Sequence, residues 1–187
     1  HVLTIEPLDD TTVAAAALKA LDGKITTPIS FANAGGVSGA VPAITATSYE
    51  DLIAIFNSSS ISGISTSPVT LTVDTISVAE ANILNAKTSG VITATINENA
   101  ASTLAGLDVS RGSTANAYAV TVGDSEPTAA ILNTIDGLTS AAVGVAGVTK
   151  VTGTLDETHT LYANKANFSG LGDEVVTVTS TVLDAAK

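Results

Sequence analysis

The stretch SVAEANILNAKTSGVITATI, residues 77–96, decides the fold, because it carries the signals of one complete helix followed by one strand. Ser77 is a favoured helix N-cap residue, and Glu80 three positions later completes a capping box. Gly90 is a stop signal for the helix. From Val91 to Ile96 apolar residues alternate with threonine, which is strand spacing. The stretch therefore predicts one helix-plus-strand unit.

The helix signal of this unit recurs along the chain. A search for a large apolar residue seven positions after a capping residue predicts six helix caps, at Thr11, Ser48, Ser77, Asn97, Ser125 and Thr154. The residues four and seven positions after each cap are expected to form one buried helix face. These pairs are Ala15 and Leu18, Leu52 and Ile55, Ala81 and Leu84, Ala101 and Leu104, Ala129 and Leu132, and Thr158 and Leu161. Residues 1–187 are therefore predicted to form a single array of about six strand–helix units.

Candidate strands separate the predicted helices. They are Val2–Ile5, Ala40–Thr45, Val69–Val73, Val91–Ile96, Ala117–Val122, Val143–Val151 and Val175–Thr179, with loops at Asn57–Pro68 and Asn167–Asp173. Alternating strands and helices favour a parallel sheet. Because several strands alternate apolar residues with threonine, only one face is expected to be covered by helices. The predicted fold is an α/β solenoid with helices on one face and an open, Thr-rich face. An all-β immunoglobulin-like repeat is the alternative.

Composition and charge exclude several classes of function. The chain is 45% hydrophobic but only 3% aromatic, so a core with many small side chains is expected. A net charge of −11 argues against nucleic acid and against anionic membrane surfaces as partners. The sequence has no cysteine, so it has neither disulfides nor thiolate metal sites. No apolar run is long enough to insert into a membrane, and the start at His1 suggests a processed chain or a fragment.

Acidic pairs are the only candidates for metal binding. Four groups lie at predicted helix starts, where the helix dipole favours negative charge, and a capping role is expected for them. These groups are Asp9-Asp10, Glu50-Asp51, Asp124 with Glu126, and Asp156-Glu157. Asp173 and Glu174 differ, because they precede a strand, and they are the weak candidates for Ca²⁺. No calcium-loop motif is present, and no other cofactor is expected.

The sequence offers no convincing catalytic group. His159 is the only internal histidine, and one histidine without cysteines is a poor metal set. A hydrolase based on Asp156 and His159 would need a third group to orient the pair, and the sequence suggests none. We therefore expect a protein that is not an enzyme, with His159 on a solvated helix face.

The alternating strands provide a candidate ligand surface. Its threonines are Thr93, Thr95, Thr121, Thr177 and Thr179. A regular threonine array on a flat sheet could bind carbohydrate or ice, although threonine is also simply a good polar strand former. Both interpretations remain open from the residues alone.

The segment Ser77–Leu107 resembles repeat modules of very large bacterial surface proteins, notably cyanobacterial haemolysin-like and S-layer-type exoproteins. The similarity lies in the Ser cap, the Ala-rich short helix, the turn Thr88-Ser89-Gly90 and the strand Ile92–Ile96. Such families imply a structural or adhesive role at the cell surface. Their calcium repeats are missing here. We therefore expect an extracellular, self-associating structural module of a surface layer, filament or adhesin, with a carbohydrate- or ice-binding module as the alternative.

Overall fold

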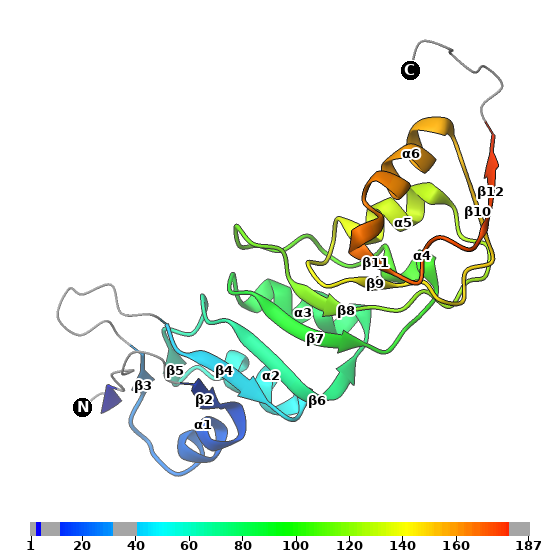
Figure 1. Cartoon of the computed structure of the whole chain (residues 1–187). Helices are drawn as coiled ribbons and strands as arrows, with labels where there is room; N and C mark the ends of the chain where they lie inside the picture. Colours follow the sequence, from blue (N-terminus) through cyan, green and yellow to red (C-terminus); the bar gives the residue numbers. More distant parts are fainter. Residues whose placement is uncertain (1–2, 5–11, 32–40, 180–187) are drawn as a thin grey trace.

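The protein is an elongated, mixed α/β structure (Figure 1). This computed structural model describes residues 3–4, 12–31 and 41–179. The described residues form six α-helices and twelve short strands, with β1 and β12 towards opposite ends of the molecule. None of these helices has the length and apolar character needed to cross a membrane.

The largest sheet has five parallel strands. In spatial order they are β2 (Thr12–Ala14), β4 (Ala43–Ala46), β6 (Val69–Ile76), β7 (Ile92–Ile96) and β8 (Ala117–Ala119). Paired residues in the last four strands lie 23 to 25 positions apart in the sequence (69 − 44, 92 − 69 and 117 − 93), except after a register shift in β6, where the offset is 20 (95 − 75). A parallel pair needs a crossover of this length, and a short helix supplies it. The predicted parallel sheet is therefore correct.

Three smaller parallel sheets complete the described strands. They are β1 (Leu3–Thr4), β3 (Ile29–Ser30) and β5 (Ile61–Ser62); β9 (Val143–Gly144) with β11 (Phe168–Ser169); and β10 (Lys150–Gly153) with β12 (Val175–Val178). A bridge between Thr121 and Gly144 continues the line of β8 into β9. The helices and the parallel pairing rule out the immunoglobulin-like alternative.

Six helices connect the strands. They are α1 (Ala15–Asp22), α2 (Tyr49–Asn57), α3 (Val78–Lys87), α4 (Ala101–Leu104), α5 (Ala129–Asp136) and α6 (Leu155–Ala163), followed by a 3₁₀ turn at Lys165–Asn167. All twelve residues predicted to make the buried helix faces are buried. In Figure 1, α2 and α3 lie on the same side of the five-stranded sheet. The helical periodicity therefore identified the core correctly.

The predicted helix caps are correct in three places. Ser77 and Thr154 each form a full capping box, with Glu80 and Glu157 as the reciprocal partners. Ser48 occupies the N-cap position of α2 but makes no side-chain cap hydrogen bond.

Two predicted caps are wrong, and one cannot be compared. The N-cap of α4 is Ala100 rather than Asn97, and that of α5 is Thr128 rather than Ser125. Each helix starts three residues later than its predicted cap implies (100 − 97 and 128 − 125). Thr11 and the pair Asp9-Asp10 lie outside the described residues.

Several short strands contradict the sequence prediction. Val143–Val151 is two strands, β9 and β10, each paired in a different sheet. The predicted loops Asn57–Pro68 and Asn167–Asp173 contain β5 and β11. Two-residue strands carry too few residues to display an alternating pattern, so periodicity cannot reveal them.

Gly90 is needed for a different reason from the one predicted. Helix α3 ends at Lys87 with Thr88 as its C-cap, so Gly90 is not the residue that stops it. A Cβ added at Gly90 would lie 2.2 Å from the carbonyl oxygen of Ser67. Gly90 therefore allows close approach between two backbone segments 23 residues apart in the sequence (90 − 67).

Candidate functional site

The predicted threonine surface is an exposed face of β7. Thr93 and Thr95 are exposed, while Ile92, Ala94 and Ile96 between and beside them are buried. This alternation places the threonine hydroxyls on the side of the sheet that the core does not cover.

Threonines on neighbouring strands extend this surface into short columns. Thr45 pairs with Thr70, and Thr70 pairs with Thr93. Adjacent strands are about 4.8 Å apart, so this column presents hydroxyls at a regular spacing. It ends at Ala117 on β8, the register partner of Thr93.

A second column runs beside the first and is shorter. Thr75 pairs with Thr95, after a register shift in β6, and the next partner is Ala119. The threonine array is therefore interrupted at β8 in both columns.

The other predicted threonines belong to different parts of the molecule. Thr121 is exposed and bridges to Gly144, so it lies beyond β8 on the same line of strands. Thr177 lies on β12 and pairs with Thr152, and the N–H of Thr179 donates to the carbonyl of Gly153 at 2.8 Å. The five threonines are all exposed but do not share one sheet, since Thr93 and Thr95 lie on the five-stranded sheet, Thr121 at an isolated bridge to β9, and Thr177 and Thr179 on and just after β12.

The calcium candidates do not form a ready site. Glu174 already accepts hydrogen bonds from the Tyr162 hydroxyl and from the Gly172 N–H. Burial alone would raise the pKa of Glu174, but these hydrogen bonds outweigh it and lower the pKa. Asp173 is exposed. Among the described residues, no three His, Cys, Asp or Glu side chains cluster in a way that could hold a metal.

The Tyr162–Glu174 contact fastens the start of β12 to α6. Burial, followed by the hydrogen bond to Glu174, raises the pKa of the Tyr162 hydroxyl. The carboxylate therefore acts in the structure as a hydrogen-bond acceptor that positions the last strand.

His159 lies on α6 and is exposed, as predicted. It lines an open groove of about 480 Å³ with Leu155, Thr158, Tyr162, Ala163 and Val176. The lining is mostly apolar, so the groove suits a packed side chain better than a charged substrate.

A buried polar network is the feature that sequence reasoning missed. Asn116 is fully buried, and its Oδ1 accepts a hydrogen bond from the Ile92 N–H at 2.9 Å. Its Nδ2 donates to Asn85 Oδ1 at 3.2 Å and to the Tyr118 hydroxyl at 3.0 Å. Burial raises the pKa of Tyr118 to about 12, against the lowering effect of the Asn116 hydrogen bond. The network joins α3 to two strands.

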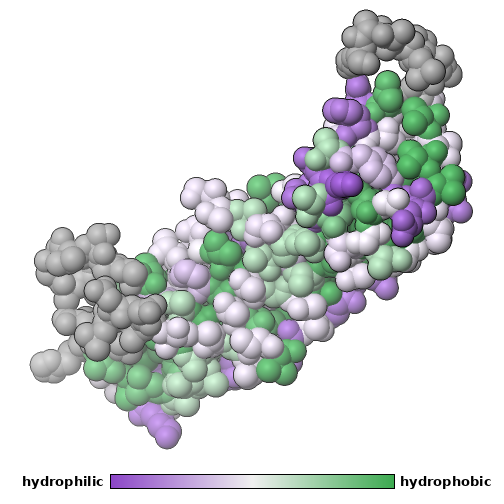
Figure 2. Space-filling view, in the orientation of Figure 1, coloured by the Kyte–Doolittle hydropathy of each residue, from purple (hydrophilic) through white to green (hydrophobic). Residues whose placement is uncertain are grey.

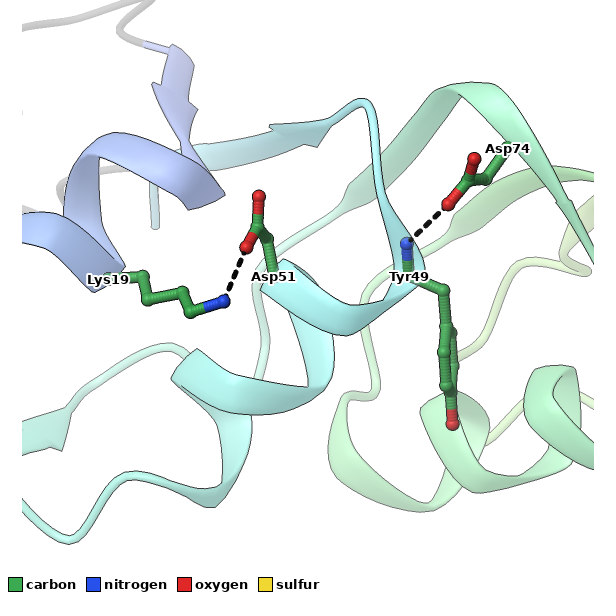
Figure 3. A network of polar contacts seen from close by, with 4 residues as sticks. All are labelled: Lys19, Tyr49, Asp51 and Asp74. Carbon is green, nitrogen blue, oxygen red and sulfur yellow. Dashed lines mark hydrogen bonds and ion pairs between the residues drawn. The ribbon is translucent and has the colours of Figure 1, made fainter.

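We call one strand and the helix that follows it a segment. Carboxylates also join a helix to the next segment along the chain. Asp74 accepts from the Tyr49 N–H at 3.2 Å, beside the Lys19–Asp51 ion pair of 2.7 Å (Figure 3). Both contacts join helix residues to residues 25 or more positions away. They therefore hold consecutive segments together.

The next two helices repeat the carboxylate contact. Glu98 accepts from the Val78 N–H, and Asp124 accepts from the Ala101 N–H, each at 2.5 Å. In all three cases the N–H belongs to the first residue of a helix, where it has no partner within the helix.

These contacts correct part of the capping prediction. Glu157 does cap its own helix, and Glu50 and Asp51 lie in the first turn of α2. Asp124, however, caps the preceding helix α4, and Glu126 pairs with Lys150 at 3.0 Å. Acidic side chains do accept hydrogen bonds at helix starts, but Asp74, Glu98 and Asp124 bind the start of the preceding helix.

Comparison with protein-family models, curated proteins and solved structures found no match. Function is therefore inferred from the geometry and sequence of this chain.

A polar pocket beside α3 is used for contacts between segments. It has a volume of about 320 Å³ and is lined by Asn85, Ala86, Asp108, Val109 and Arg111. The Arg111 guanidinium donates to the Ala86 carbonyl, and Asn85 Nδ2 donates to the Val109 carbonyl at 3.0 Å. Its polar groups hold the loop after α4 against α3 rather than leaving an open binding site.

Proposed function

We propose that this chain is a non-enzymatic structural module, an α/β solenoid of stacked strand–helix units that takes part in self-assembly. One observation carries the proposal: polar side chains bind neighbouring segments of the chain. Asn82, Asn85, Asn116 and Asn133 each make one hydrogen bond to a residue 24 positions away. In a protein built for catalysis, such groups would converge on one cavity.

The pattern of contacts supports a quasi-one-dimensional arrangement. In a stacked array each unit touches only its neighbours, so hydrogen bonds recur at the repeat length. The strand offsets between β4 and β8 are 23 to 25 positions before the register shift in β6 and 20 after it, and the larger values match the 24-residue side-chain contacts. An array of this kind is stiff and elongated, which suits a spacer or a filament.

The place of action that we propose is the bacterial cell surface. The resemblance of Ser77–Leu107 to modules of large surface exoproteins supports a surface layer, filament or adhesin. The absence of cysteine, the acidity and the threonine-rich strands are compatible with an extracellular location.

Particle size tests the proposal directly. We expect the full chain to form particles larger than one 18.5 kDa subunit in light scattering, and extended objects in electron microscopy. Screens for hydrolase activity should show no turnover. A strictly monomeric chain that turns over a substrate would overturn the proposal.

A carbohydrate- or ice-binding module is the second candidate, and the in-register threonines favour it. The column Thr45–Thr70–Thr93 places three hydroxyls across three adjacent strands. Its interruption at Ala117 limits the flat surface available to an extended ligand.

Replacing Thr93 and Thr95 by lysine tests this second candidate. Both side chains are exposed, so the double variant should fold normally while losing at least tenfold in affinity, or about 1.4 kcal/mol, if the face binds a ligand. Glycan arrays and ice-affinity capture measure the effect. Thr134→Lys is the control, because Thr134 is exposed on α5 and its hydroxyl bonds only within that helix. Equal binding by the double variant and the control would dispose of this function.

A further inference from the structure

Two helix positions make the contacts with the next segment in α1, α3 and α5. They are the fifth and eighth residues after the N-cap, which are Lys19 and Asp22 in α1, Ile53 and Phe56 in α2, Asn82 and Asn85 in α3, and Asn133 and Asp136 in α5. In α2 both side chains pack against the core. In the other three helices the pair makes polar contacts with residues further along the chain.

The polar contacts are specific at both positions. The fifth-position residue Lys19 binds Asp51 at 2.7 Å, and Asn133 Nδ2 donates to the carbonyl of Glu157 at 2.9 Å. The eighth-position residue Asp22 accepts from Ser58 and Ser60 at 2.8 and 2.5 Å.

The eighth-position contact recurs in α5, where Asp136 accepts from Asn167 Nδ2 at 3.2 Å. In α1 and α5 the partners of the fifth position are themselves equivalent. Asp51 and Glu157 are each the third residue after the N-cap of the following helix. In α1 and α5 the fifth residue therefore contacts the third residue of the next helix, whereas Asn82 of α3 contacts Gly106 and Asp108, beyond the end of α4.

In α6 the same two positions are His159 and Tyr162, and they line the open groove of about 480 Å³. The Tyr162 hydroxyl donates a hydrogen bond to Glu174, and Tyr162 also lines the groove. The groove thus lies where the other helices contact a following segment. The groove is therefore a surface of the kind that contacts the next segment elsewhere in the chain, and no described residue occupies it.

The last described strand, β12, also has a side without a partner among the described residues. Within the described residues β12 pairs only with β10, so its outer edge is open. Val175, Val176 and Val178 on β12 are 64%, 43% and 42% exposed. Figure 2 shows hydrophobic atoms gathered at this end, over the region where Figure 1 draws β10 and β12. An exposed apolar strand edge is a template for adding another strand.

The opposite end of the molecule offers a matching surface. Helix α1 exposes Ala16, Ala17 and Ala20, and Ala17 is the third residue after its N-cap. Strand β2, which leads into α1, pairs only with β4 in the described part of the chain. A small alanine face fits against larger side chains such as those of His159 and Tyr162.

We infer that the groove on α6 and the open edge of β12 receive α1 and β2 of a second copy of this chain. The contact is head-to-tail. His159 of one copy lies against Ala17 of the next, just as Lys19 of α1 lies against Asp51 of α2 within one chain. Because the two surfaces differ, the contact is heterologous and does not close on itself, so it generates an open filament. The inference rests on the proposed self-assembly and specifies its interface.

Cysteine cross-linking tests the interface, since the natural chain has no cysteine. The full chain carrying Ala17→Cys and His159→Cys is treated with a short bismaleimide and separated by size under denaturing conditions. We expect a ladder at multiples of 18.5 kDa. Each single variant should give no species beyond a dimer, because one thiol per chain cannot extend a chain of cross-links.

The matched control pairs His159→Cys with Thr93→Cys, which lies on the open sheet face. Circular dichroism and unchanged particle size establish that each variant folds and assembles as the unmodified chain does. Folded double variants that give no ladder would overturn the inference, as would an equal ladder from the control pair. A groove covered by another segment or by a different partner would give the first of these results.

A further substitution does not depend on cross-linking. Ala17→Trp places a bulky side chain on an exposed position, so folding should be preserved while assembly falls at least tenfold in light scattering. Assembly that persists unchanged in Ala17→Trp would overturn this interface but leave the proposed structural function intact. A monomeric unmodified chain would instead contradict both.

Discussion

Leu84→Ala is expected to lower the free energy of unfolding by about 2–5 kcal/mol. Leu84 is 0% exposed and is the large side chain on the buried face of α3, whose other buried residues are Val78, Ala81 and Asn85. Because the alanine and valine beside it are small, few neighbours can move into the space that the substitution leaves. The cost therefore combines lost burial with a residual cavity.

Chemical denaturation measures this cost, and Ile83→Ala is the matched control. Ile83 is the preceding residue of the same helix but is 45% exposed, so its truncation should cost well under half as much. Equal losses in the two variants would show that the helix face is assigned wrongly.

Hydrogen exchange on Leu84→Ala also separates a stacked array from a single globular core. In an array each unit contacts only its neighbours, so the loss of protection should concentrate in residues 48–76 and 97–122. Protection near Val178 should change little. A uniform loss along the whole described chain would contradict the solenoid proposal.

The core could be predicted from the sequence because its signal is local. Leu84 and Ala81 stand at helical spacing within one short stretch, and the same spacing identified buried residues in all six helices. This held even for α5, whose predicted cap was wrong, since Ala129 and Leu132 belong to the buried face whichever residue starts the helix.

The start of α4 was less predictable because the partner of its first N–H is not local, whereas α5 is capped locally by Thr128. The first N–H of α4 is bound by Asp124, which lies 23 residues further along the chain. No residue next to Ala101 carries that information, so a search for nearby Ser, Thr or Asn selected Asn97 instead. The short helix α4 is held in this way by the following segment.

In the candidate sites, too, local features could be predicted from the sequence and contacts between distant residues could not. Alternation within β7 correctly predicted that Thr93 and Thr95 are exposed, because alternation is a property of one strand. Their alignment with Thr70 and Ala117 depends on register between strands, which the sequence does not display. The Asn85–Asn116 contact joins residues 31 positions apart and has no sequence signature that we can identify.

Asn116→Leu is expected to cost about 3–5 kcal/mol, because leucine keeps the volume but removes every hydrogen bond of the side chain. Asn116 is 0% exposed, and the substitution removes the acceptor of the Ile92 N–H and one of the two donors to Asn85 Oδ1, which keeps only the Arg111 N–H at 3.4 Å. Each buried polar group left unsatisfied costs about 1–3 kcal/mol. Tyr118 also loses the donor to its hydroxyl, in a site where burial already disfavours its ionised form.

Asn82→Leu is the control for this prediction, since it removes an amide with the same kind of partners near the surface. Asn82 bonds the Gly106 carbonyl and the Asp108 N–H, each at 2.8 Å and in exposed surroundings where water can replace it. Its loss should cost about 1 kcal/mol. Denaturation of both variants gives the comparison. If Asn116→Leu proved as stable as Asn82→Leu, the buried asparagine network would not be what holds α3 to the strands beside it.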